Sequence, residues 1–229
     1  QKMFDASVNT RGLRTGAAIV SHGGSLQIVA AGNVRIGGRL ASVATRHHPV
    51  GTITITAGKD ITITKTAQLT AAGRKHGGVP ADGGTISVKA DGNLKVATGA
   101  SFDASASNGG NGGFVELSAK GTATVGNINL NLSAPGGVTG TLLLDPYNLV
   151  VGDPNNPGTG SVLTSNSDYS YSSNLVTNGA NVVLSADNSI TIAAGGIIDT
   201  RQFDHSAALS STNASTGSSG SITLNAPNI

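Results

Sequence analysis

The chain has 229 residues, with 33 Gly, no Cys, 3% aromatic and 11% charged residues. An ordinary globular domain is about 25% charged, so this chain has unusually few charges. Disordered chains combine low hydrophobicity with high net charge, so the low charge argues against disorder. The scarcity of aromatic residues favours a thin core between closely spaced backbones. The composition excludes disulfides and thiol chemistry, and since no window approaches about 18 continuous apolar residues, we expect no membrane insertion.

The net charge of +2 is unevenly distributed along the chain. Residues 1–120 contain 13 of the 14 Lys and Arg and 6 of the 12 Asp and Glu, which gives +7, whereas residues 121–229 contain one Arg and six Asp, which gives −5. No signal peptide opens the chain, and its last residues, GSITLNAPNI, stop in the middle of a pattern. We therefore expect a segment of a longer protein.

One pattern of alternating residues recurs along the chain. Each copy holds two strands with period-2 alternation, a tight corner of Gly, Asn or Asp between them, and a short third strand. The second copy, for example, reads GTITITAGKDITITKTAQLTA. Copies begin at Gly24, Gly51, Gly84, Gly113, Ala180 and Gly220.

The repeat predicts an all-β fold. A single copy cannot bury its apolar face, but stacked copies can, because each strand pairs with its equivalents above and below. We therefore predict a right-handed parallel β-helix with three strands per coil of about 20 residues. The predicted inward core stack is Ile53, Ile55, Ile61, Ile63, Ile86, Val88, Leu94, Val96, Val115, Leu117, Val182, Leu184, Ile190 and Ile192.

Three regions follow from this reading. Residues 1–150 form β-helix coils with short basic insertions, 151–179 a Ser/Asn/Gly-rich insertion with a short strand near 174–177, and 180–229 further coils that end truncated. The shorter insertions leave the coils after the third strand, so we expect them at one corner and on one face of the solenoid. They cover residues 43–50, 71–83 and 105–112.

The insertions carry a candidate ligand-contact patch. If they stack, their basic residues form a surface that attracts anionic glycans, although solvated loops are often basic without binding anything. No aromatic residues are interspersed, so we expect no nucleic-acid partner, and the histidines lack a metal-ligand spacing, so we expect no metal or cofactor. The patch comprises Arg46, His47, His48, Arg74, Lys75 and His76.

The acidic residues give no sign of a catalytic centre. Glycoside cleavage needs carboxyl groups that converge within a few ångströms, and the twelve acids here are dispersed, with no D-x-D or D-D. Asp103 and Asp199 share a repeat position but lie several coils apart. We expect no enzyme; the alternative is a polysaccharide-processing β-helix whose acids, such as Asp103 and Glu116, converge only in three dimensions.

Residues 112–151 are the most specific stretch, and they read GGFVELSAKGTATVGNINLNLSAPGGVTGTLLLDPYNLVV. This stretch resembles large bacterial exoproteins of the filamentous haemagglutinin and high-molecular-weight adhesin type, which are secreted by the two-partner route. The resemblance extends over roughly residues 84–229, with Leu142 where many relatives have Trp. We interpret Asp145, Pro146, Tyr147 and Asn148 as a structural corner, in which Asp145-Pro146 stops the strand and Tyr147 covers the end of the core.

The resemblance implies a function in adhesion and virulence. It implies a shaft or stalk of a secreted protein on the bacterial cell surface, with contacts made by residues 43–50, 71–83 and 151–179. It also implies two partners: a glycan or protein receptor on a host cell or surface, and an outer-membrane transporter that binds a region absent here. A carrier segment of a toxin or haem-acquisition exoprotein is a further alternative.

Overall fold

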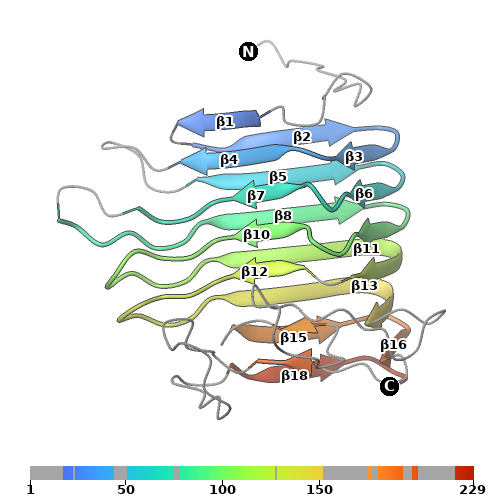
Figure 1. Cartoon of the computed structure of the whole chain (residues 1–229). Coiled ribbons are helices and arrows are strands. Elements are labelled where there is room, and N and C mark those ends of the chain that lie inside the picture. The colour runs from blue at the N-terminus through green and yellow to red at the C-terminus, as the bar shows by residue number, and fades with distance from the viewer. Residues whose placement is uncertain are drawn as a thin grey trace.

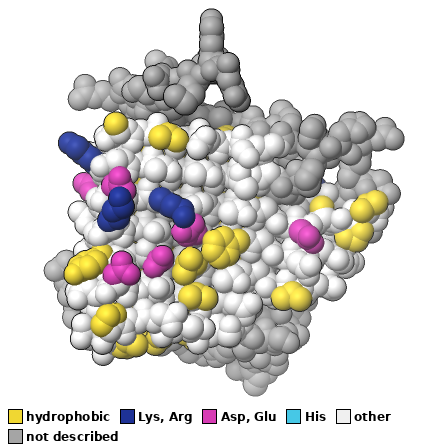
Figure 2. Space-filling view, turned by 180° about the vertical axis from the view of Figure 1, so that it is seen from behind, with side chains coloured by type: hydrophobic (Ala, Val, Ile, Leu, Met, Phe, Trp, Pro, Cys, Tyr) yellow, Lys and Arg dark blue, Asp and Glu magenta, His cyan; other side chains and the backbone are white. Residues whose placement is uncertain are grey.

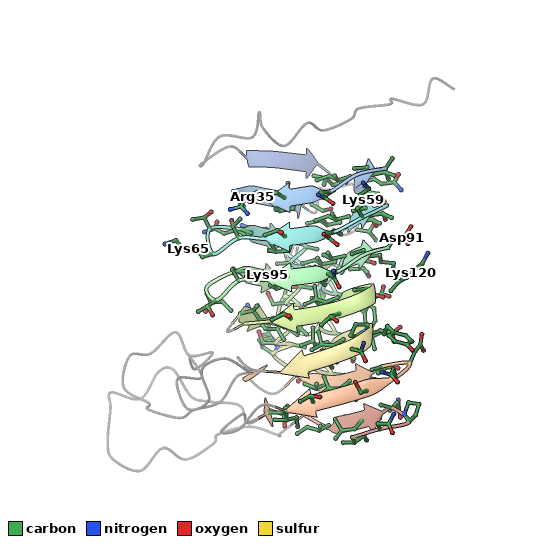
Figure 3. The ribbon with its side chains drawn as sticks, turned by 90° about the vertical axis from the view of Figure 1, so that its right-hand side faces the viewer. Arg35, Lys59, Lys65, Asp91, Lys95 and Lys120 are labelled. Carbon is green, nitrogen blue, oxygen red and sulfur yellow. The ribbon has the colours of Figure 1, made fainter. Side chains whose placement is uncertain are left out.

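The chain folds into a right-handed parallel β-helix, which confirms the predicted fold class (Figures 1 and 3). The computed structural model describes residues 18–22, 24–43, 51–74, 78–126, 128–151, 175–176, 180–192, 198–200 and 220–229. Within these ranges every regular element is a strand, and every strand pairing is parallel.

Each coil contributes up to three strands. The long sheet holds the first strands in the order β2 (Leu26–Ala30), β5 (Thr52–Ala57), β8 (Thr85–Ala90), β11 (Phe114–Val125), β13 (Thr141–Val151), β15 (Asn181–Ser185) and β18 (Ile222–Asn225). The second strands are β3 (Val34–Ile36), β6 (Ile61–Ile63), β9 (Leu94–Val96), the C-terminal parts of β11 and β13, and β16 (Ser189–Ile192). The third strands are β1 (Ala18–His22), β4 (Arg39–Val43), β7 (Gln68–Thr70), β10 (Ser101–Asp103) and β12 (Asn129–Asn131), while β14 (Leu175–Val176) pairs with β17 (Ile198–Asp199).

Insertions change the length of a coil without disturbing its strand register. Residues that are hydrogen-bonded between adjacent coils are 27, 33, 29 and 27 residues apart from β2 to β13. The separation rises to 40 residues between Asn181 and Ser221, whose coil also includes β17. Nevertheless Leu26, Ile53 and Ile86 follow one another in one inward row of the long sheet. The extra residues are therefore accommodated outside the core.

The core is a narrow column of small and medium apolar side chains. Rows of Ile, Val and Leu line the long sheet, and the largest buried side chain, Phe102, sits between Leu69 and Leu130 on the adjacent coils. All the predicted core residues are buried except Ile192, which is 40% exposed. The prediction is wrong there because the next described coil reaches β16 only through a bridge between Ser189 and Asn228, at the other end of the strand.

The described insertion segments leave the coils at one corner, as predicted, and stack on one another (Figure 1). Backbone N–H groups of one loop donate to carbonyls of the next, as from Gly73 to Ser105 at 2.7 Å and from Gly109 to Pro135 at 2.7 Å. Residues 44–50, 75–77, 152–174 and 177–179 lie outside the described residues. The loops thus continue the hydrogen-bonding of the sheets beyond the core.

The strand does not stop at Asp145-Pro146, contrary to the sequence-based expectation. β13 runs through both residues, and Pro146 pairs with Ala119 in an inward row that is otherwise alanine. The ring of Pro146 is buried in that row, and the register shifts only after it. Because proline lacks an N–H, the ladder loses one hydrogen bond at this position and continues beyond it. Tyr147 is 47% exposed and does not cover the core, but its carbonyl accepts the N–H of Asn188 at 2.9 Å.

Candidate functional site

The structure describes only one residue of the predicted basic patch. Arg74 is exposed at the start of its insertion and makes no ion pair within the part of the chain that the structure describes. The remaining members lie outside the described residues; they are Arg46, His47, His48, Lys75 and His76. The predicted patch therefore stays a prediction.

A different group of cations gathers on the narrow face formed by the second strands (Figure 3). Arg35 on β3, Thr62 on β6 and Lys95 on β9 are in register and point outward, since their neighbours along each strand are buried. Lys59 precedes β6 and Lys65 follows it, and Figure 3 shows them at opposite edges of the same face. We call Arg35, Lys59, Lys65 and Lys95 the cationic cross, with Thr62 at its centre.

The geometry of the cationic cross follows from strand spacing. Adjacent strands lie about 4.8 Å apart, so the backbones of Arg35 and Lys95 are roughly 10 Å apart across Thr62. Lys59 and Lys65 are each three residues from Thr62, which is also roughly 10 Å at about 3.3 Å per residue. Two charges at this separation repel by only about 0.4 kcal/mol in bulk water, and salt screens that further. The four cations can therefore share this face at little cost in stability.

The cations of the cross form no ion pair among the described residues, unlike two lysines of the long sheet. Lys89 pairs with Glu116 at 2.8 Å and Lys120 with Asp91 at 2.7 Å, whereas no member of the cross has an ion pair among the described residues. Asp60 lies beside Lys59, and its Oδ1 accepts the N–H of Asn93 at 2.8 Å. The carboxylate of Asp60 offsets one of the four positive charges, which leaves the face with a net positive charge. The narrow face is thus exposed, positively charged and largely open to a ligand.

Sequence reasoning missed the cationic cross because it searched the insertions for charge. The signal lies in the middle, outward residue of the second strand of each copy. These strands read V-R-I, I-T-I and L-K-V in three successive coils. Aligned on the repeat, Arg35 and Lys95 occupy equivalent positions one coil above and one coil below Thr62.

The acids that sequence reasoning singled out do not converge. Asp103 lies on β10 in the five-stranded sheet, and its Oδ1 accepts hydrogen bonds from the backbone N–H and the hydroxyl of Ser105. Glu116 lies on the long sheet and is held by Lys89 and by the hydroxyl of Ser87 at 3.0 Å. Among the described residues, no group of three His, Cys, Asp or Glu side chains could hold a metal ion.

An open groove of about 350 Å³ lies where the insertions meet the long sheet. Its floor is largely glycine, because a Cβ on Gly113 would overlap the carbonyl oxygen of Gly84, and Phe114 is its aromatic wall. No charged side chain lines the groove.

On the face shown in Figure 2, charged side chains gather toward one side of an otherwise mostly neutral surface.

The fold defines a class, a parallel β-solenoid scaffold. No protein-family model matches the chain, and no match was found among curated proteins or solved structures. In the described ranges, no helix is long and apolar enough to cross a membrane.

Proposed function

We propose that the chain is a shaft segment of a secreted bacterial surface adhesin, which holds binding loops at a fixed position along a rod. The observation that carries this proposal is the unbroken row of seven parallel strands from β2 to β18. Six steps of about 4.8 Å make this row roughly 29 Å long, and a rod of this kind lengthens simply by adding coils. A longer rod therefore needs only more copies of the same repeat.

The sequence of residues 112–151 supports the adhesin class, since it resembles exoproteins secreted by the two-partner route. On that basis the protein acts at the bacterial cell surface, binds a glycan or protein receptor on a host cell or surface, and depends on an outer-membrane transporter. The role is non-catalytic. The separation of Asp103 and Glu116, each engaged in its own local contacts, supports a scaffold over the polysaccharide-processing alternative.

The insertion face is the surface that we propose for attachment. Its loops stack by backbone hydrogen bonds, so residues within 71–83 are held beside 105–112 and gain a fixed orientation from the rod. Loops on a rigid scaffold are a common location of binding residues. The basic residues in 43–50 and 71–83 then attract an anionic receptor.

A host-cell binding assay tests this proposal. The triple variant Arg46→Ala/Arg74→Ala/Lys75→Ala should lose the salt-sensitive part of binding. The control Lys89→Ala/Lys120→Ala removes cations from another face and should bind like the wild type. Retained binding in the triple variant would overturn attachment through the basic insertions.

A further inference from the structure

We propose that the cationic cross is a binding site for a linear acidic polysaccharide, separate from the insertion face. The site is centred on Thr62 and lies on the outward side of β3, β6 and β9. It does not rest on the proposed adhesin function, because the charge and geometry of this face alone support it.

The site is rigid because strands carry two of its cations and flank the other two. Arg35 and Lys95 are in fixed register with Thr62, and the buried residues on either side of each hold the three side chains outward. Lys59 and Lys65 are exposed in the turns at the two ends of β6, so the adjoining strand fixes where their side chains begin, and the side chains themselves become ordered on binding. A preorganised surface of this kind loses less entropy on binding than mobile loops do.

The row along the solenoid axis alternates cations with hydroxyl groups. It runs Arg35, Thr62, Lys95 and Thr124 in register, with each step about 4.8 Å. The hydroxyl of Thr62 makes no hydrogen bond to any of the described residues, which leaves it available to a sugar. Within this row the two cations are about 10 Å apart, which suits a glycan in which charged sugars alternate with neutral ones, while Lys59 and Lys65 flank the row on the Thr62 coil.

The shape and chemistry of the face favour a polysaccharide over nucleic acid or a membrane. Single-stranded nucleic acids are bound with aromatic side chains on which bases stack, and the outward residues here are Arg, Thr, Lys and Thr. The strands β3, β6 and β9 are three residues long, so the row of Arg35, Thr62 and Lys95 lies on a strip only about 10 Å wide, with Lys59 and Lys65 in the turns on either side. A narrow charged ridge fits one linear chain lying along the axis.

The test measures binding of the whole chain to four glycans at several salt concentrations. Hyaluronate carries a carboxylate on every second sugar, polygalacturonate carries one on every sugar, dextran sulfate carries sulfates, and dextran is neutral. We expect hyaluronate to bind and dextran not to bind. Equal binding of dextran would overturn the proposal, and a preference for dextran sulfate over both carboxylate polymers would overturn the match to alternating charge.

Arg35→Thr/Lys95→Thr is the decisive variant, because threonine already occupies the same outward position in β6 and in β11. Loss of two ionic contacts should weaken hyaluronate binding about tenfold and make the remaining binding less sensitive to salt. The control Arg74→Thr/Lys89→Thr has the same change in net charge at positions away from the second strands, and its binding should stay within about twofold of wild type. Equal losses in both variants would overturn the site and indicate a response to net charge alone.

Two further variants test the charge spacing of the cationic cross and its independence from the insertion face. Thr62→Lys fills the centre of the cationic cross and should shift preference from hyaluronate toward polygalacturonate. Arg46→Ala/Arg74→Ala/Lys75→Ala should bind hyaluronate unchanged, so failure of the insertion-face proposal and failure of this one are distinguishable. Tighter binding of single-stranded DNA or of phosphatidylserine vesicles than of hyaluronate, lost in Arg35→Thr/Lys95→Thr, would overturn the assignment to a polysaccharide.

Discussion

The side-chain oxygen Oδ1 of Asn33 accepts the backbone N–H of Asp60 on the next coil at 3.1 Å. The same bond recurs from Asp60 to the N–H of Asn93 at 2.8 Å and from Asn93 to the N–H of Thr122 at 2.9 Å. The corner turns the chain away from the regular sheet pairing, and this side-chain ladder satisfies N–H groups that the turn would otherwise leave to water. Asn and Asp at the corner therefore connect successive coils as well as forming the turn.

Removing one member of this ladder should destabilise the fold moderately. Asn93→Ala removes the acceptor for Thr122 and should cost about 0.5–1.5 kcal/mol, measured by urea unfolding followed by circular dichroism. Asn93→Asp keeps an acceptor oxygen, as Asp60 does one coil earlier, and should recover most of that loss. Equal losses in both variants would show that the hydrogen bond is not the stabilising feature.

Glycine at position 51 is required by close contact between coils. A Cβ there would overlap the carbonyl oxygen of Gly24 and lie 2.7 Å from the hydroxyl of Ser42, which itself donates to that carbonyl. Gly51→Ala should therefore cost at least about 1–3 kcal/mol, the usual range for an overpacked site. Gly32→Ala is the matched control, since its Cβ would meet nothing within 4 Å, and it should change stability by less than about 0.5 kcal/mol.

Phe102 is the largest buried side chain of the five-stranded sheet that the third strands form. It is fully buried between Leu69 and Leu130, so Phe102→Ala should cost about 3–5 kcal/mol in the free energy of unfolding. Phe102→Leu gives the row four successive leucines, at positions 40, 69, 102 and 130, and should cost less than about 1.5 kcal/mol. If both substitutions cost the same, the neighbouring coils do not hold the ring as the packing indicates.

The ion pair between Lys89 and Glu116 should contribute little to stability. The Lys89 side chain is 51% exposed and that of Glu116 is 14% exposed, so solvent screens the 2.8 Å contact. A double-mutant cycle with Lys89→Met and Glu116→Gln should give a coupling energy of at most about 1 kcal/mol, and less at high salt. A coupling above about 2 kcal/mol, unchanged by salt, would contradict the view that this pair lies on an open surface.

The inward rows could be predicted from the sequence because two signals agree. Period-2 alternation sets the inward face, and the repeat identifies which residues stack, as Ile55 does on Val88. At Pro146 the two signals disagreed: local propensity favoured a break, whereas the repeat aligns Pro146 with Ala119 and hence with an inward position. The structure follows the repeat, since pairing on both sides of the proline holds the strand together.

The exposed features were harder to predict. Ile192 fits the inward pattern, but the pattern does not reveal whether another strand covers it. Arg35 and Lys95 form part of one surface only when the coils are aligned, and coil separations of 27 and 33 residues hide that alignment in the linear sequence. Insertions of variable length thus conceal this row of charge in the linear sequence.

The measurement that tests the central account most directly is a joint assay of binding and cleavage on a panel of acidic and neutral polysaccharides. The chain is incubated with each polymer, and retained binding and newly formed reducing ends are quantified on the same sample. A scaffold without a catalytic centre should bind acidic polymers and leave the number of reducing ends unchanged over prolonged incubation. A steady release of new reducing ends that depends on Asp103 or Glu116 would contradict the account and establish a polysaccharide-cleaving enzyme.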